Sequence, residues 1–151
     1  MALILEGKIS DKWDQVCGLI HENWQELVSI KPIMRLSPQI DLYKALEDAG
    51  LLLALFAYDS NETIIGYSAN IISNHIHFSD LVTCSNDALF LTKSHRKGRA
   101  GMQLILETEK KAKERGARLM LWHAKPETDL AFLLPRIGYE TEELLLRKEM
   151  F

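Results

Sequence analysis

A short basic segment that follows an apolar run carries the residues of this sequence best suited to chemistry. Residues 89–91 are Leu-Phe-Leu, and the chain then becomes cationic and glycine-bearing before a predicted amphipathic helix. A loop that passes from a strand into a helix leaves backbone N–H groups unpaired at the helix start, where the helix dipole adds positive potential. Arg96, Lys97 and Arg99 add three permanent charges at this place. The pattern predicts a site for a ligand that carries several phosphates.

The other residues with reactive side chains form no recognisable metal or nucleophile site. His75 and His77 share one face of a strand or loop, but no third ligand lies at metal spacing. Cys84 has only a distant histidine to activate it. The sequence therefore predicts no metal site and does not favour a cysteine nucleophile.

The elements that must position the basic segment follow from the spacing of apolar residues. Helices are predicted from Ser10-Asp11 to about Ile30, from Ser37-Pro38 to Gly50, from Ala100 to Arg115 and at Glu127–Leu134. Strands are predicted at Ala2–Leu5, Leu51–Tyr58, Thr63–Ile72, a stretch ending at Leu91, Arg118–His123 and a final pair whose second member is Leu144–Lys148.

Length and composition predict one globular domain over residues 1–151. The chain is 47% hydrophobic and 26% charged, and no run approaches the about 20 apolar residues of a membrane span. Residues 1–6 lack the cationic start of a secretion signal. Cys17 and Cys84 form no disulfide framework, so a reducing cytoplasm is the expected location.

The distribution of charge separates the basic segment from the rest of the chain. The net charge is −3, and Lys93, Arg96, Lys97 and Arg99 contribute +4, so the remaining residues carry −7. An anionic ligand is therefore expected at the basic segment, and the rest of the chain should tolerate a cationic one. A nucleic-acid-binding tract is the alternative, but the acidic body and the lack of aromatic residues interleaved with basic ones disfavour it.

The residues from Arg96 to Leu104 resemble the coenzyme-A loop of GNAT-type N-acetyltransferases. That loop reads [Arg/Gln]-x-x-Gly-x-[Gly/Ala] and continues into a helix with a leucine three residues on. Arg96 corresponds to the first position, Gly101 to the last and Leu104 to the leucine, while Arg99 stands where the family has its first glycine.

A second register of the same loop starts one residue earlier. With His95 as the first position, Gly98 and Ala100 occupy the two small positions, and Gln103 takes the place of the leucine. The ending of the chain also resembles the family, in which a short helix leads into Gly-[Phe/Tyr], here Gly138-Tyr139, and a last strand. The resemblance covers nearly the whole chain and implies an α/β (α+β) fold with a mixed, mostly antiparallel twisted sheet flanked by helices.

The resemblance also implies a co-substrate, acetyl-coenzyme A, and the residues that hold it. In this family the fourth strand splays from the fifth, and its open edge pairs with the pantetheine arm. Carried across, these residues are Phe90, Leu91 and Thr92, with the Leu91 N–H as a candidate donor to the oxyanion. The phosphates would bind at Arg96, Lys97, Gly98, Arg99, Ala100, Gly101 and Met102.

Two residues are candidates for the base that takes a proton from the amine. Asp87 lies four residues before Leu91, where several family members carry an acidic base, although it could simply begin the strand in a turn. His123 ends the predicted strand where the two central strands diverge, and its ordinary pKa near 6.5 suits proton transfer. Packing beside Trp122 is its structural alternative. Many members protonate the leaving thiolate with a tyrosine, and here Leu134 occupies that position.

The predicted function is direct acetyl transfer from acetyl-coenzyme A to an amine, without a covalent enzyme intermediate. The acidic body favours a cationic acceptor, which could be a small amine or a protein lysine. A catalytically weak or inert module of the same fold, which binds coenzyme A or a protein, is the alternative. Pairing of two copies through their sheets is common in the family, so a homodimer is a further expectation.

Overall fold

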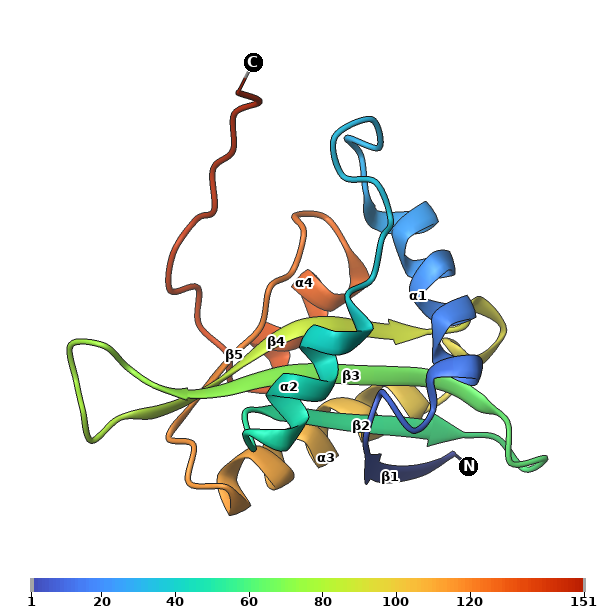
Figure 1. Ribbon diagram of the computed structural model, residues 1–151, viewed down its shortest axis with the longest axis horizontal. Helices are drawn as coiled ribbons and strands as arrows, with labels where there is room; N and C mark the ends of the chain where they lie inside the picture. Colours follow the sequence, from blue (N-terminus) through green and yellow to red (C-terminus); the bar gives the residue numbers. More distant parts are fainter. Residues whose placement is uncertain (1, 151) are drawn as a thin grey trace.

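The structure is a computed structural model that describes residues 2–150 (Figure 1). Its strands are β1 (Leu3–Gly7), β2 (Leu52–Tyr58), β3 (Ile64–Asn74), β4 (Val82–Leu91) and β5 (Leu119–Leu121). Its helices are α1 (Trp13–Leu27), α2 (Ile40–Asp48), the 3₁₀ turn η1 (Lys93–His95), α3 (Ala100–Glu114) and α4 (Asp129–Arg136). The predicted α/β fold class is confirmed.

The strands form a mixed sheet in the order β1-β2-β3-β4-β5. Strands β1 to β4 pair with one another in antiparallel fashion, whereas β5 pairs with β4 in parallel. Strand β2 reads LLALFAY and is buried along almost its whole length, as expected for a central strand covered on both faces. The parallel pair needs a crossover, and α3 supplies it.

Helices cover both faces of the sheet (Figure 1). On one face α1 and α2 pack over Ala54, Phe56 and Tyr67. On the opposite face α3 places Leu104 and Ala112 against strand residues such as Leu53 and Leu55, which alternate with the first set along β2. The core is thus divided into two layers by the sheet. No helix within residues 2–150 has the length and apolar character that crossing a membrane requires.

The beginning of the first helix differs from the prediction. Helix α1 starts at Trp13 after Lys12, which provides no side-chain cap. Ser10, at the predicted start of the helix and of a residue type that often caps one, instead donates from its N–H and its hydroxyl to the Glu47 carboxylate (3.2 and 3.3 Å). A contact 37 residues away in sequence therefore outcompetes the local cap.

The predicted final strands are wrong within the described residues. After α4 the chain forms no strand up to residue 150, and Leu144, Leu145 and Leu146 are 80–90% exposed. Figure 1 shows this C-terminal segment extending away from the sheet. A strand forms only where an adjacent strand accepts and donates its backbone hydrogen bonds. The apolar composition of these residues does not specify such a partner.

Candidate functional site

The two central strands part beside the candidate site. Strand β4 pairs with β5 only at Thr83, Cys84 and Ser85, so residues 86–91 have β3 alone as a neighbour within the described chain. We call the point after Ser85 the fork. The Thr92 N–H donates to Ile65 O (2.8 Å), so by the alternation of a strand the N–H and C=O of Leu91 face the open side. The Leu91 N–H is available there for an extended ligand, whereas the Leu91 C=O accepts a hydrogen bond from Arg96 Nε (2.6 Å).

A bulge and a glycine shape the open end of β4. Between the pairs Asn70–Asn86 and Ala69–Ala88 the register shifts, and Asp87 is the extra residue. Gly66 pairs with Leu91, and a Cβ at Gly66 would lie 2.6 Å from the Phe90 carbonyl oxygen. The strand can take this position because residue 66 has no side chain.

A buried polar network lies behind the bulge. Asn86 Nδ2 donates to Asn70 Oδ1 (2.9 Å) and to the Ala88 carbonyl (3.0 Å), and Asn70 Nδ2 donates to Ser68 Oγ (2.9 Å). Thr108 of α3 lies 3.0 Å from Ser68 Oγ. Because these buried groups satisfy one another, the network fixes the bulge relative to α3.

The start of α3 follows the basic segment for which the sequence predicts an anion site. The first helical hydrogen bond runs from Gln103 N–H to Arg99 O (2.9 Å), which leaves the N–H groups of Ala100, Gly101 and Met102 without an intrahelical acceptor. Within residues 2–150 no side chain caps this end, and its first turn contains no acidic residue. Lys97, Gly98 and Arg99 are exposed beside it. The loop is open to a ligand, and the helix dipole favours an anion there.

Arg96 makes different contacts from its basic neighbours. Its Nη1 and Nη2 donate to the two carboxylate oxygens of Glu26 at 2.6 and 2.7 Å, and its Nε donates to the Leu91 carbonyl at 2.6 Å. The guanidinium also lies over the Phe90 ring, 5.4 Å from its centroid. The hydrogen bond from Arg96 lowers the pKa of Glu26, although partial burial opposes this shift.

Asp87 is exposed, and its charge acts on two tyrosines on the α1–α2 side of the sheet. Burial raises the pKa of Tyr43, and the negative charge of Asp87 raises it further. Burial also raises the pKa of Tyr67, to which the Asp87 charge adds. The Oδ1 atom of Asn23, on the same side, is buried and accepts no hydrogen bond within residues 2–150. Sequence reasoning placed Tyr43 only on an inward helix face, and no local pattern singled out Tyr67 or Asn23.

His123 lies just beyond the end of β5 and is exposed. The predicted strand to His123 is too long, because pairing with β4 ends at Leu121. The Nε2 atom of His123 lies 3.1 Å from Ser85 Oγ, at the last β4 residue that pairs with β5. Asp87 and His123 therefore both lie near the fork.

Other residues considered from the sequence have structural surroundings. Cys84 is buried, and burial raises its pKa to about 11, so the thiol is protonated at neutral pH. Leu134, at the position where relatives carry a tyrosine, is buried in α4. Within residues 2–150 no group of three or more His, Cys, Asp or Glu residues could hold a metal ion.

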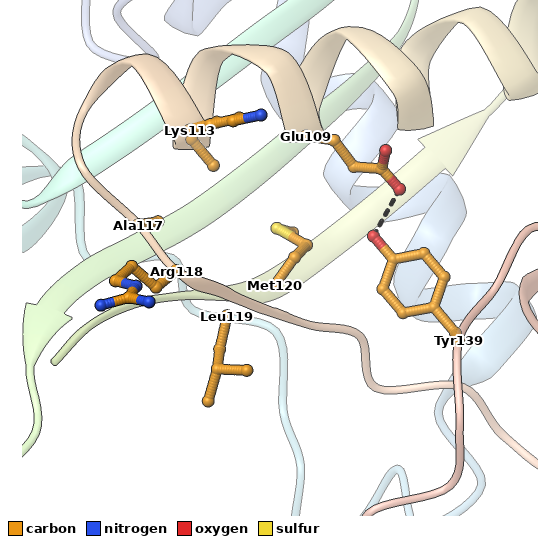
Figure 2. Close-up of a pocket in the computed structure, with 8 residues that line it drawn as sticks. Glu109, Lys113, Ala117, Arg118, Leu119, Met120 and Tyr139 are labelled. Carbon is orange, nitrogen blue, oxygen red and sulfur yellow. Dashed lines mark hydrogen bonds between the residues drawn. The ribbon is translucent and has the colours of Figure 1, made fainter.

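One cavity is separate from the predicted cofactor residues. It has a volume of about 400 Å³ and lies between β5, the second half of α3 and Tyr139. Figure 2 shows the Tyr139 hydroxyl pointing to Glu109 of α3, to which it donates at 2.6 Å. Burial and this hydrogen bond raise the pKa of Tyr139. The fork is instead an open strand edge, so an extended ligand could pair with it without an enclosed cavity.

Solved structures of acetyltransferases share the fold over the full chain. An aminoglycoside acetyltransferase from an uncultured soil metagenomic sample has a TM-score of 0.78 at 15% identity and covers 100% of this chain and 99% of its own. The ribosomal-protein-alanine N-acetyltransferase of Brucella melitensis biovar Abortus 2308 has a TM-score of 0.73 at 16% identity, covering 100% and 99%. The fold is that of the GNAT acetyltransferases.

More distant sequences also adopt the GNAT fold. An acetyltransferase of Trypanosoma brucei has a TM-score of 0.73 at 10% identity and covers 99% of this chain and 100% of its own. No protein-family model and no curated protein matches the sequence. At such identities the likeness establishes the GNAT fold, and the chemistry has to be argued from the fork and the loop of this chain.

Proposed function

We propose that this chain is an N-acetyltransferase that moves an acetyl group from acetyl-coenzyme A to an amine. The observation that supports this most directly is the open edge of β4 beside the uncapped, basic start of α3. An extended thioester arm could pair with the strand while its phosphates lie at the helix start. The GNAT fold supports the same chemistry.

The phosphates of acetyl-coenzyme A are assigned to the loop and the first turn of α3. Lys97 and Arg99 are exposed and offer charge, and residues 100–102 offer backbone N–H groups. A Cβ added at Gly101 would meet only a Leu91 methyl group, at 3.8 Å. The position therefore accepts glycine or alanine, the two residues that the loop pattern of the family has there. The residues present therefore fit the ligand.

The reaction forms a C–N bond and breaks a C–S bond. The neutral amine attacks the thioester carbon, the coenzyme leaves as a thiolate, and the amine loses a proton. The Leu91 N–H is positioned on the open side of β4 to stabilise the developing oxygen charge. Asp87 or His123 receives the amine proton, directly or through water. No tyrosine is assigned to the thiolate, since Leu134 takes that place.

The acceptor is proposed to be an amine that is cationic before it reacts, either a small molecule or a protein lysine. The residues outside the basic segment carry a net charge of −7. Structural neighbours include an enzyme described as an aminoglycoside acetyltransferase and another described as a ribosomal-protein-alanine N-acetyltransferase. Small amines and protein amines are both represented among them.

Binding and turnover of acetyl-coenzyme A test the proposal. Calorimetry should detect binding to the wild type, and Lys97→Glu with Arg99→Glu should weaken it at least about tenfold, as expected when two charge-assisted contacts become repulsive. Lys110→Glu with Lys113→Glu, the same charge change farther along α3, is the matched control and should leave binding unchanged. Absence of binding to the wild type would refute the proposal.

An inert relative that binds coenzyme A or a protein is the second candidate, because Leu134 and Arg99 depart from the family pattern. A thiol-release assay with a panel of amines separates the two. Release above the rate of hydrolysis supports the enzyme. Binding without release supports the inert module.

We also propose that the chain acts as a single domain, forms a homodimer and functions in the cytoplasm. Within the described residues Cys17 and Cys84 are unpaired, which suits a reducing compartment. The exposed leucines 144–146 and the outer edge of β5 provide apolar and backbone surface for a second copy. Acidic residues 140, 142 and 143 could face Lys113 and Arg118, which line the cavity beside β5.

A further inference from the structure

The contacts of Arg96 engage every donor nitrogen of its guanidinium group. Nη1 and Nη2 bind the Glu26 carboxylate in a bidentate pair, and Nε binds the carbonyl of Leu91. The Phe90 ring lies below the group, 5.4 Å away. Bidentate pairs of this kind are among the stronger and more directional hydrogen-bonded contacts in proteins.

These contacts join two parts of the molecule that are distant in sequence. Glu26 lies in the last turn of α1, 70 residues before Arg96. Leu91 is the last residue of β4, at the end of the open edge. Arg96 itself follows η1, at the start of the basic loop. One side chain thus fastens α1, the end of β4 and the loop together.

We propose that Arg96, held by Glu26, is a positioning residue that sets the free end of β4 and the loop against α1, and that it is not a ligand of the phosphates. The inference rests on the proposed acetyl transfer and changes the role that the resemblance gives Arg96. Glu26 becomes a functional residue through Arg96, although it lies outside the loop.

The neighbouring cations support this division of roles. Binding a phosphate through Arg96 would require the side chain to give up Glu26 and Leu91. Lys97 and Arg99 are exposed and form no salt bridge within residues 2–150, so they can meet a phosphate without breaking a contact. The side chains of Arg96 and Glu26 are 33% and 28% exposed, so the pair lies at the surface and its specificity comes from the bidentate geometry.

Two thioesters separate positioning from phosphate binding. Acetyl-coenzyme A carries the phosphates, whereas acetyl-pantetheine carries the same reacting group without them. Glu26→Gln and Arg96→Gln should each lower kcat/KM by about tenfold with both thioesters, the scale expected for losing one charge-assisted contact. Lys97→Gln with Arg99→Gln should lower it with acetyl-coenzyme A only. A loss for Arg96→Gln confined to acetyl-coenzyme A would overturn the inference.

Exchanging the charges of residues 26 and 96 provides a second test. Glu26→Arg and Arg96→Glu singly place like charges together and should lower kcat/KM with both thioesters. The double variant Glu26→Arg/Arg96→Glu restores opposite charges and should recover at least part of the loss. If the double variant is as impaired as Arg96→Glu alone, the positioning role is refuted.

Hydrogen exchange tests the inference without any thioester. In the ligand-free protein, Glu26→Gln should speed amide exchange in a peptide covering residues 88–92, whereas Lys97→Gln with Arg99→Gln should not. Unchanged exchange in Glu26→Gln would overturn the inference. Faster exchange in a protein that never releases thiol would refute the proposed reaction while preserving the positioning role.

Discussion

Gly66 shows how the lack of one side chain determines the position of the candidate site. It pairs with Leu91 at the end of β4, and an added Cβ would lie 2.6 Å from the Phe90 carbonyl oxygen and 2.8 Å from a Leu91 methyl group. The first of these contacts is with backbone, which cannot rotate away. A methyl group here must therefore move the open end of the strand.

We expect Gly66→Ala to lower the free energy of unfolding by about 1–3 kcal/mol, the usual cost of overpacking. Urea denaturation provides the measurement. Gly98→Ala is the matched control, because no atom lies within 4 Å of its added Cβ. Equal stability of the two variants would contradict the close approach.

The two cysteines should differ in reactivity. Burial raises the pKa of Cys84 to about 11, whereas Cys17 is partly exposed. Because the thiolate is the reactive form, iodoacetamide at pH 8 should modify Cys17 in the native protein and spare Cys84. Mass spectrometry of the labelled peptides measures this. Denatured protein, in which both should react, is the control, and rapid native labelling of Cys84 would disagree with its burial.

The Glu26–Arg96 pair should make a pH-dependent contribution to stability. Arg96 lowers the pKa of Glu26 from its ordinary value of 4.5, so the folded protein holds the Glu26 proton less tightly than the unfolded chain. The contribution is therefore complete above about pH 4.5 and is lost as the pH falls through the lower pKa of the folded state.

Stability measured against pH for the wild type and Glu26→Gln tests this sign. The difference in their free energies of unfolding should be constant from about pH 6 to about pH 8, where an ordinary carboxyl group is fully ionised. It should shrink below about pH 4.5. Glu142→Gln, in the exposed C-terminal segment, is the control for loss of one carboxylate. A difference that grows on acidification would contradict the assignment.

At the scale of elements, α3 is joined to the sheet by polar as well as apolar contacts. Thr108 is fully buried in α3, with its hydroxyl 3.0 Å from Ser68 Oγ and 2.7 Å from Leu104 O. Through Ser68 the hydroxyl belongs to the network that holds Asn86 beside the bulge. The helix that begins at the basic loop is therefore fixed relative to the fork.

Thr108→Val keeps the shape of the side chain and removes the hydroxyl. We expect a loss of about 1 kcal/mol in the free energy of unfolding, because buried Ser68 Oγ loses one hydrogen-bond partner and keeps Asn70 Nδ2. Thr141→Val, the same change at an exposed position, should have little effect. Chemical denaturation of both variants gives the answer, and equal losses would show that the network contributes nothing.

At the scale of the whole molecule, the C-terminal segment is the part with unused apolar surface. Leu144, Leu145 and Leu146 are 80–90% exposed, and the one side-chain hydrogen bond that residues 140–150 make within the described chain joins Arg147 to Ser29 (3.0 Å). The outer edge of β5 has no neighbouring strand among these residues. A second copy could cover both, which is the basis of the proposed homodimer.

Removal of residues 141–150 should convert the proposed dimer to a monomer, because it removes the leucines and part of the acidic stretch. Leu144→Glu with Leu146→Glu should have the same effect. Ile76→Glu, at a residue 92% exposed between β3 and β4, is the control and should leave the mass unchanged. Light scattering measures the mass, and a monomeric wild type or a dimeric truncated chain would refute this interface.

The sequence alone determined the elements whose signals are local. The apolar run of β2, the periodic faces of α1 and α3, and the basic segment before Ala100 each carry their pattern in neighbouring residues. Burial of those patterns yields the α/β layers, and the loop before α3 is exposed as its composition predicts. The mixed fold could therefore be predicted from local signals, whereas the anion site at the basic loop stays a prediction.

Tertiary structure alone decided which residues meet across the sheet. Asp87 and His123 lie near the fork because β4 and β5 part after Ser85, and Arg96 binds Glu26 because α1 ends beside β4. No local pattern marks Glu26 as a partner 70 residues away, or decides whether leucines 144–146 find a neighbouring strand. Pairing between distant segments depends on the packing of the complete sheet, and local sequence does not encode it.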